Sequence, residues 1–171
     1  SEGSQVSPMG VGYVNTPGIY SDEQVEGWKL VTEAVHNEGG KIFIQLWHVG
    51  RLTHPYFLSG ELPLAPSAIN PKHPIRTPEG EKSSVTPQEM TEEDISQVIN
   101  QFAVGAVNAL KAGFDGVEIH SSNGYLLHQF FVPCSNTRTD KYGGSIKNRA
   151  RIMFELLDEM KKYIPTNRIG V

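Results

Sequence analysis

The chain has 171 residues, of which 38% are hydrophobic and 20% are charged, a composition typical of a globular protein with one substantial core. Its formal net charge is -4 and its lysines and arginines are scattered, which argues against binding to nucleic acid or to an anionic membrane. No apolar run approaches the ~20 residues of a membrane span, no secretory signal opens the chain, and Cys134 has no partner for an internal disulfide. These features predict a cytoplasmic protein.

The first predicted element is a helix over residues 22–38. Ser21, followed three residues later by Gln24, forms a capping-box pattern, and hydrophobic residues then recur at helical spacing until two glycines end the helix. The next run, Lys41–Trp47, is short and largely apolar, as expected for a strand that is buried on both faces of a parallel sheet. Gln45 is its polar exception. A buried amide is costly unless it is paired, so Gln45 needs a partner, either the edge of a heterocyclic cofactor or a neighbouring backbone group.

Residues 48–90 carry most of the prolines and show no sustained hydrophobic period. The sequence therefore predicts a long loop, and loops of this length inside compact domains are usually lids, binding elements or disordered segments. Thr91 with Asp94 then opens a second helix, whose hydrophobic stripe runs to Gly113. A strand over residues 115–120 follows at once.

The last part of the chain predicts a third helix and the start of another strand. Ser145 is placed to cap this helix, and residues 168–171 begin the strand. The hydrophobic residues of the helix recur on one face: Met153, Leu156, Leu157 and Met160. Strands and helices thus alternate along the chain, which implies parallel pairing with right-handed crossovers.

Two α/β architectures fit this alternation, a doubly wound open sheet and a (β/α)₈ barrel. An open sheet that binds nucleotides normally has a G-x-G-x-x-G turn between a strand and a helix, and this chain has none, which favours the barrel. A barrel takes ~250 residues and closes only with eight strands. Either the chain is a piece of a longer protein, or its missing strands come from elsewhere.

The residues that best suggest chemistry lie at the end of the strand over residues 115–120. His120 and Asn123 can both donate hydrogen bonds, and two such donors can converge on one carbonyl or nitro oxygen. Tyr125 is a phenol that holds its proton at neutral pH and can protonate a strongly basic carbanion. Each residue also has a structural alternative: a hydrogen-bonding histidine, an asparagine in a left-handed turn and an aromatic residue of the core.

Other polar residues give weaker signals. Trp47 and His48 end the preceding strand and suit a pocket wall, although Trp47 also fits a plain core. Cys134 with His128 lacks an orienting third group, which does not favour a cysteine nucleophile. Arg138 is expected to form a loop ion pair with Asp140. The sequence does not favour a zinc or iron site, because the candidate ligands lack a recognisable spacing: His48, His54, Glu118 and His120.

Several stretches resemble the old yellow enzyme family of FMN-dependent ene-reductases. They are Ser1–Gly3 with Asn15–Gly18, Gln45–Trp47, Gly116–Leu127 and Asn136–Arg149, and the similarity covers essentially the whole chain. The resemblance implies an α/β (β/α)₈ TIM barrel, of which this chain covers only part, about strands 3 to 5 with the intervening helices. It also implies tightly bound FMN, reduction by NADH or NADPH, hydride transfer to the β-carbon of an activated alkene, and protonation of the α-carbon.

By the same resemblance, His120 and Asn123 anchor the substrate, Tyr125 donates the proton and Trp47 lines the pocket. The implied substrate is a small molecule, an α,β-unsaturated carbonyl compound or a nitro compound. These roles agree with the chemistry read from the residues themselves, since a proton donor such as Tyr125 requires a reaction that forms a carbanion.

The resemblance also places Gly3, Gln45 and His120 at the flavin. The family's first strand would precede Ser1, its flavin-binding arginine would follow Val171, and its phosphate site is absent, so FMN binding is expected to need the missing barrel strands of the parent chain. The alternative is a truncated, non-catalytic fragment or interaction remnant that cannot hold FMN. A barrel hydrolase with a metal is a third reading. A homo-oligomer is compatible with the sequence.

Overall fold

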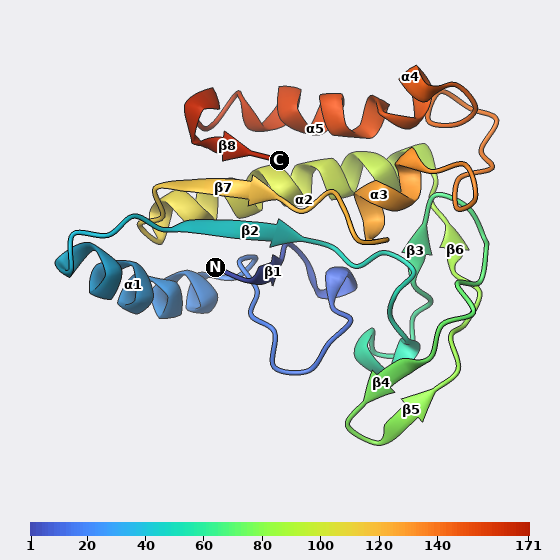
Figure 1. Ribbon diagram of the computed structural model, residues 1–171, viewed down its shortest axis with the longest axis horizontal. Coiled ribbons are helices and arrows are strands. Elements are labelled where there is room, and N and C mark those ends of the chain that lie inside the picture. Colours follow the sequence, from blue (N-terminus) through green and yellow to red (C-terminus); the bar gives the residue numbers. More distant parts are fainter.

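The computed structural model describes residues 1–171 and is built around a four-stranded parallel sheet. Its strands are β1 (Gly3–Gln5), β2 (Phe43–Trp47), β7 (Gly116–Ile119) and β8 (Ile169–Gly170), and they lie side by side in that order (Figure 1). The spatial order of the strands is therefore the order in which the chain makes them. A doubly wound sheet would reverse its strand order, whereas a (β/α)₈ barrel does not.

Three helices cover one face of this sheet: α1 (Asp22–Asn37), α2 (Glu92–Lys111) and α5 (Arg151–Met160). The middle helix, α2, packs against α1, α5 and both central strands, as Figure 1 shows. The capping box expected at Ser21 is present at the start of α1, and Thr91 with Asp94, expected to open the second helix, forms another at the start of α2. Because all three crossover helices share one face, the strands and helices form an arc of a barrel wall.

The two faces of the sheet have different surroundings. Alternate side chains of β2 and β7 point toward the helices and are no more than 1% exposed: Ile44, Leu46, Val117 and Ile119. They join a cluster of 26 buried residues that includes Phe102 of α2. On the other face, Gln45 is half-buried and Phe43 is 41% exposed. We call this second surface the open face, and it corresponds to the interior of a closed barrel.

The expectation of a long loop without regular structure over residues 48–90 is wrong. The segment contains β3 (Leu64–Ala65) paired in parallel with β6 (Gln88–Glu89), and the antiparallel hairpin of β4 (Ile75–Thr77) and β5 (Gly80–Lys82). These strands have only two or three residues each, too few for a hydrophobic period to emerge. We call residues 66–87, which join β3 to β6, the flap. Figure 1 shows it at the side of the molecule toward which β2 and β7 point.

Other short elements were not predicted either. β1 contains only Gly, Ser and Gln, so it has no apolar pattern, and its pairing with β2 makes it a strand. Three single-turn 3₁₀ helices are added, η1 (Pro8–Gly10), η2 (Pro55–Phe57) and η3 (Thr166–Arg168). No helix combines the length and apolar composition needed to cross a bilayer.

The connection after β7 is also more structured than expected. The helix α3 (Leu126–Phe131) follows the strand, and the predicted third helix is divided into α4 (Ile146–Arg149) and α5 around Ala150. Ser145 caps α4, as predicted, by accepting a hydrogen bond from the backbone N–H of Asn148.

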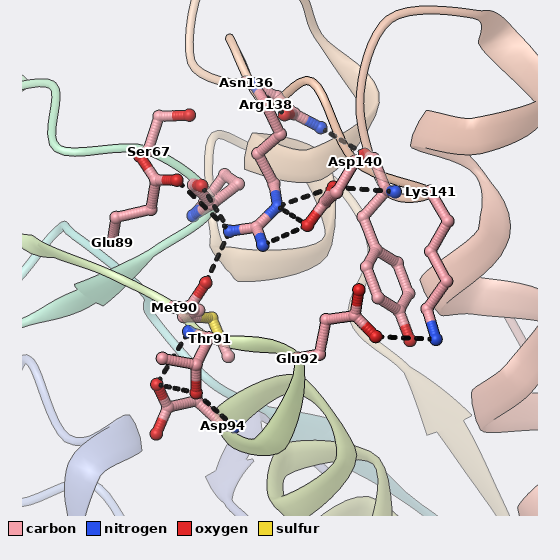
Figure 2. Close-up of polar contacts among 12 residues, drawn as sticks. Ser67, Glu89, Met90, Thr91, Glu92, Asp94, Asn136, Arg138, Asp140 and Lys141 are labelled. Carbon is pink, nitrogen blue, oxygen red and sulfur yellow. Dashed lines mark hydrogen bonds and ion pairs between the residues drawn. The ribbon is translucent and has the colours of Figure 1, made fainter.

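The flap is tied to the loop before α4 by Arg138, whose side chain is only 5% exposed (Figure 2). The guanidinium donates hydrogen bonds to the carbonyl oxygen of Pro66, the first residue of the flap, to that of Met90, which follows β6, and to the carboxylate of Asp140. The expected ion pair between Arg138 and Asp140 is confirmed, and it lowers the pKa of Asp140. A second tie joins the same segments, because the Ser67 hydroxyl accepts from the backbone N–H of Thr137 at 3.0 Å.

Candidate functional site

The open face carries a row of three residues from three adjacent strands. Gly3 of β1 is in register with Gln45 of β2, which in turn is in register with Glu118 of β7. The Gln45 amide reaches Glu118 only through a long hydrogen bond of 3.4 Å, so it retains capacity for another partner. A Cβ on Gly3 would lie 2.6 Å from Cε3 of Trp47, so this position must be glycine for the backbone to lie flat against the indole ring.

Three aromatic side chains meet at the carboxyl ends of β2 and β7. Trp47 is the last residue of β2, and His120 follows β7 directly, with its backbone N–H bonded to the Leu46 carbonyl. The indole and the imidazole are stacked with their centroids 6.0 Å apart and their planes 19° apart. Tyr125 meets both rings edge-on, with centroid separations of 4.9 Å. The structure thus brings together His120, Tyr125 and Trp47, which the sequence predicts as site residues.

Tyr13 completes this cluster, and the sequence analysis missed it. It lies in the loop after η1 and stacks on Trp47 with centroids 5.4 Å apart. Its hydroxyl lies 3.0 Å from the hydroxyl of Tyr125. The loop is brought back to the sheet by backbone hydrogen bonds from Gln5 to Pro17 and from Ile19 to Gln5. Nothing in the linear sequence pairs Tyr13 with a residue more than 100 positions away.

The protonation states in this cluster are set mainly by burial. Burial and the hydrogen bond to Tyr13 raise the pKa of Tyr125 above its usual range, so the phenol holds its proton at neutral pH. Burial lowers the pKa of His120, although the nearby Glu118 carboxylate opposes this shift. The imidazole is therefore neutral at pH 7. Its Nδ1 accepts from the backbone N–H of Ser122 at 3.4 Å, which leaves Nε2 as the ring nitrogen that donates.

Asn123 lies in the turn between His120 and Tyr125 and is exposed. Its φ of 56° is in the left-handed region, which matches the structural reading of an asparagine beside a glycine in a turn. The hydrogen bonds of this turn are made by neighbouring residues, including the Gly124 N–H, which donates to Nδ1 of His128. The side chain of Asn123 makes no hydrogen bond to His120, Tyr125 or Trp47. The expected contact between its amide and a substrate oxygen stays a prediction.

His48 does not line the pocket, contrary to expectation. It is 2% exposed, and its ring lies against Gly10, where a Cβ would be 3.3 Å from the imidazole. Nδ1 accepts a hydrogen bond from the backbone N–H of Gly50 at 3.1 Å, and Nε2 has no partner. Burial lowers the pKa of His48 to about 4, so the ring is neutral at pH 7. Successive side chains along an extended chain point to opposite faces. Trp47 lies on the open face, so His48, the next residue, points away from it.

The structure contains no group of three or more His, Cys, Asp or Glu side chains placed to hold a metal ion. Cys134 is a free, exposed thiol. His128, which the sequence analysis weighed and did not favour as a partner for Cys134, accepts a hydrogen bond from the backbone N–H of Gly124.

Comparison with known proteins gives consistent matches over the full chain. The model of the NADH:flavin oxidoreductase / NADH oxidase family matches residues 1–171. The flavin oxidoreductase hxnT of Emericella nidulans is 47% identical over 174 residues, which are 100% of this chain and 44% of that protein. The 12-oxophytodienoate reductase 7 of Oryza sativa subsp. japonica is 41% identical, with 100% of this chain and 44% of the relative covered.

Solved structures show the same similarity in three dimensions. Morphinone reductase in complex with tetrahydroNAD superposes with a TM-score of 0.94 at 41% identity, covering 99% of this chain and 49% of that one. The old yellow enzyme homologue from Zymomonas mobilis superposes with a TM-score of 0.95 at 40% identity, covering 99% and 47%.

The chain spans about half the length of these relatives. Its four strands are therefore part of a TIM barrel, as the sequence predicts. The family's description also names the flavin and the NADH that the resemblance implies. With a matching family model over every residue and an aromatic site at the strand ends, the chain belongs to the NADH:flavin oxidoreductase / NADH oxidase family, as a partial barrel of the old yellow enzyme type.

Proposed function

We propose that this chain is the substrate-protonating part of an FMN-dependent ene-reductase, which reduces the activated C=C bond of α,β-unsaturated carbonyl compounds and also accepts nitro compounds. One observation carries the proposal. The Tyr125 phenol and the His120 imidazole meet over Trp47 at the ends of adjacent strands, on the same face as Gln45. Barrel enzymes keep their catalytic residues at this end of the strands.

The residues of the open face fit a flat, polar heterocycle such as the flavin ring of FMN. Gly3 removes the side chain that would otherwise project from β1 against Trp47, and Gln45 offers an amide whose only side-chain contact is 3.4 Å long. A carboxamide can both donate to and accept from the edge of such a ring. Gly3 and Gln45, with His120 at the strand end, would hold the ring, and FMN would supply the hydride after its reduction by NADH or NADPH.

The protein's own residues would orient and protonate the alkene. The Nε2–H of the neutral His120 and the amide of Asn123 would donate to the carbonyl oxygen and stabilise the negative charge that develops there. Tyr125 would pass its hydroxyl proton to the α-carbon. Its raised pKa makes it a weak acid, which suits a strongly basic carbanion as the proton acceptor. The cluster of Tyr13 and Trp47 would exclude water from one side of the substrate.

The relatives support an oxygen-bearing substrate. Those named 12-oxophytodienoate reductase and morphinone reductase are named for the reduction of oxo compounds. The amide and imidazole donors proposed for this chain suit the oxygen of such a compound.

A second hypothesis is a truncated, non-catalytic remnant that keeps the site residues but cannot hold FMN.

Colour separates the two readings. The purified chain is mixed with FMN, passed through a desalting column and examined for flavin absorbance, alone and when joined to the remaining barrel segments of morphinone reductase. A yellow protein that bleaches with NADPH and recovers when an enone is added supports the ene-reductase. If even the completed barrel stays colourless, the enzyme proposal is wrong and the remnant remains.

A further inference from the structure

Gln129 is a buried polar side chain to which the proposed function gives no role. It belongs to α3, whose other buried residues are all apolar, and it is only 1% exposed. Figure 1 shows this helix at the end of the sheet toward which β2 and β7 point. A buried amide is costly unless its hydrogen bonds are made, so the partners of Gln129 indicate what it does there.

The Gln129 amide binds two segments that are far apart in the sequence. Its Nε2 donates to the carbonyl oxygen of Gly124 at 2.7 Å and to that of Val49 at 3.0 Å. Its Oε1 accepts from the backbone N–H of Arg51 at 3.1 Å. Val49 and Arg51 belong to the loop after β2, and Gly124 belongs to the turn before α3. One side chain therefore joins the segments that follow the two central strands.

The turn before α3 needs such support because two successive residues are left-handed. Asn123 has a φ of 56° and Gly124 has a φ of 84°, and a residue with a Cβ adopts this conformation only at a cost. Nδ1 of His128 accepts from the Gly124 N–H at 3.1 Å, while Gln129 binds the Gly124 carbonyl. The backbone N–H of Gln129 also binds the Tyr125 carbonyl at 2.8 Å. The peptide groups on both sides of Gly124 are thus held by α3.

The loop after β2 is shaped around the same amide. Gly50 has a φ of 60°, and a Cβ at this position would collide with Oε1 of Gln129, so glycine lets the backbone approach the side chain. Arg51, whose N–H binds Gln129, also donates through its guanidinium to the Ile69 carbonyl of the flap at 3.0 Å. Gln129 is therefore anchored to a loop that is itself tied to the flap.

From these contacts we infer that Gln129 is a positioning residue for Tyr125, and that His128 assists it. Gln129 acts through the backbone of the turn, which sets where the phenol lies against Trp47. A misplacement of about 1 Å can slow a reaction about 10²-fold, so the transfer of the Tyr125 proton should depend on this support. The inference rests on the proposed function for the role of Tyr125 and deepens it by naming the residue that orients the proton donor.

The first test examines the turn by NMR on the full chain without FMN. Gln129→Met keeps the length of the side chain and removes its hydrogen bonds. Gln101→Met is the matched control, because the Gln101 amide oxygen is buried in α2 without a hydrogen-bond partner. Gln129→Met should speed hydrogen exchange of the Gly124 amide about fivefold or more relative to the amides of α2, and should weaken the nuclear Overhauser contacts between the Tyr125 and Trp47 rings. The control should leave both signals as in the wild type.

The second test asks whether Gln129 acts through Tyr125. In FMN-loaded protein, Gln129→Met should slow flavin reoxidation by a saturating enone about tenfold or more. In the Tyr125→Phe background the same substitution should change reoxidation by less than about twofold, because no phenol is left to position. A purely structural role of Gln129 would slow reoxidation equally in both backgrounds.

His128→Ala is the milder variant if Gln129→Met does not fold, because His128 is only half-buried and binds the same turn. It should weaken the same ring contacts and slow reoxidation about threefold, again only while Tyr125 is present. If the turn loosens in Gln129→Met but Tyr125→Phe reoxidises at the wild-type rate, the positioning by Gln129 stands and the proposed function fails. Unchanged exchange and ring contacts in Gln129→Met, or equal slowing in both backgrounds, would overturn the inference and leave the ene-reductase proposal standing.

Discussion

The hydroxyl of Tyr13 lies 3.0 Å from the hydroxyl of Tyr125, within hydrogen-bonding distance, although 112 positions separate the two residues in the sequence. Tyr13 is 42% exposed, whereas Tyr125 is half-buried between Trp47 and His120. The proposed proton donor is thus linked through one hydrogen bond to a residue in contact with water. This link gives the buried phenol a route by which a proton could be replaced after each turnover.

Replacing the proposed proton donor should affect only one half of the reaction. In FMN-loaded protein, Tyr125→Phe should leave flavin reduction by NADPH unchanged and slow flavin reoxidation by an enone about 10²-fold or more, the usual range for a general acid. Stopped-flow absorbance of the flavin measures both steps separately. Unchanged reoxidation would remove Tyr125 from its proposed role.

Replacing Tyr13 should change the titration of Tyr125 without removing the proton donor. The hydrogen bond to Tyr13 contributes to the raised pKa of Tyr125, so Tyr13→Phe should lower that pKa, while burial keeps it above the value of free tyrosine. Phenolate absorbance during a pH titration, with Tyr125→Phe subtracted as the reference, measures this shift. The interpretation fails if Tyr125 ionises at the same or a higher pH in Tyr13→Phe.

The close approach of β1 to the indole ring predicts a steric effect at Gly3. In Gly3→Ala the added methyl would lie 2.6 Å from Cε3 of Trp47, so the indole must move and the free energy of unfolding should fall by about 1–3 kcal/mol. Urea unfolding and the near-ultraviolet circular dichroism of Trp47 report both effects. Gly27→Ala is the matched control, because nothing lies within 4 Å of its added methyl inside α1, and it should stabilise the chain. Equal effects of the two substitutions would contradict the steric explanation.

The buried imidazole of His48 predicts a loss of stability in acid. Its folded-state pKa of about 4 lies below the usual value of 6.5, so the unfolded chain binds a proton more readily. The stabilisation is complete above pH 6.5 and is lost as the pH falls toward 4, at up to ~1.4 kcal/mol per pH unit. Urea unfolding at pH 7, 6 and 5 measures this slope.

The control for that slope is an exposed histidine. His48→Gln should flatten the pH dependence, and His73→Gln, on the surface of the flap, should retain it. If His48→Gln proves too unstable to study, the NMR titration of the His48 ring in the wild type serves instead. A pKa near 6.5 for His48 would refute the prediction.

Arg138 should determine whether the flap stays closed. Arg138→Lys keeps the positive charge but cannot bind Pro66, Met90 and Asp140 at once, so it should lower the free energy of unfolding by about 3 kcal/mol and speed proteolysis within residues 66–87. Limited proteolysis with mass spectrometry locates the cuts. Lys141→Gln, which removes an exposed ion pair with Glu92 and an ammonium group 5.2 Å from the centre of the Tyr142 ring, is the control and should leave the flap resistant. Cuts that appear equally in both variants would contradict the role of Arg138.

Much of the fold follows from local patterns in the sequence. The capping boxes at Ser21 and Thr91 and the hydrophobic stripe of α2 place two of the three crossover helices correctly. The strands that end at Trp47 and precede His120 are also found within two residues of their predicted bounds, although β2 is not buried on both faces, since Phe43 is 41% exposed. These elements are long or have a strong hydrophobic pattern. The structure that their local sequence favours is therefore also the one that buries their hydrophobic residues. β1 and the strands of the flap could not be predicted, because their few residues become strands only through pairing with distant segments.

The same distinction between local pattern and distant contact holds for the residues of the site. The sequence by itself determined which chemical groups end β2 and β7, since Trp47, His120 and Tyr125 follow directly from the chain, and the alternation of side chains puts Gln45 and Trp47 on one face. Only the tertiary structure decided that His48 is buried, that Asn123 adopts a left-handed turn and that Tyr13 meets Tyr125. Periodicity is a local property of the backbone. Contacts between loops depend on how the sheet and helices assemble around them, which no local pattern records.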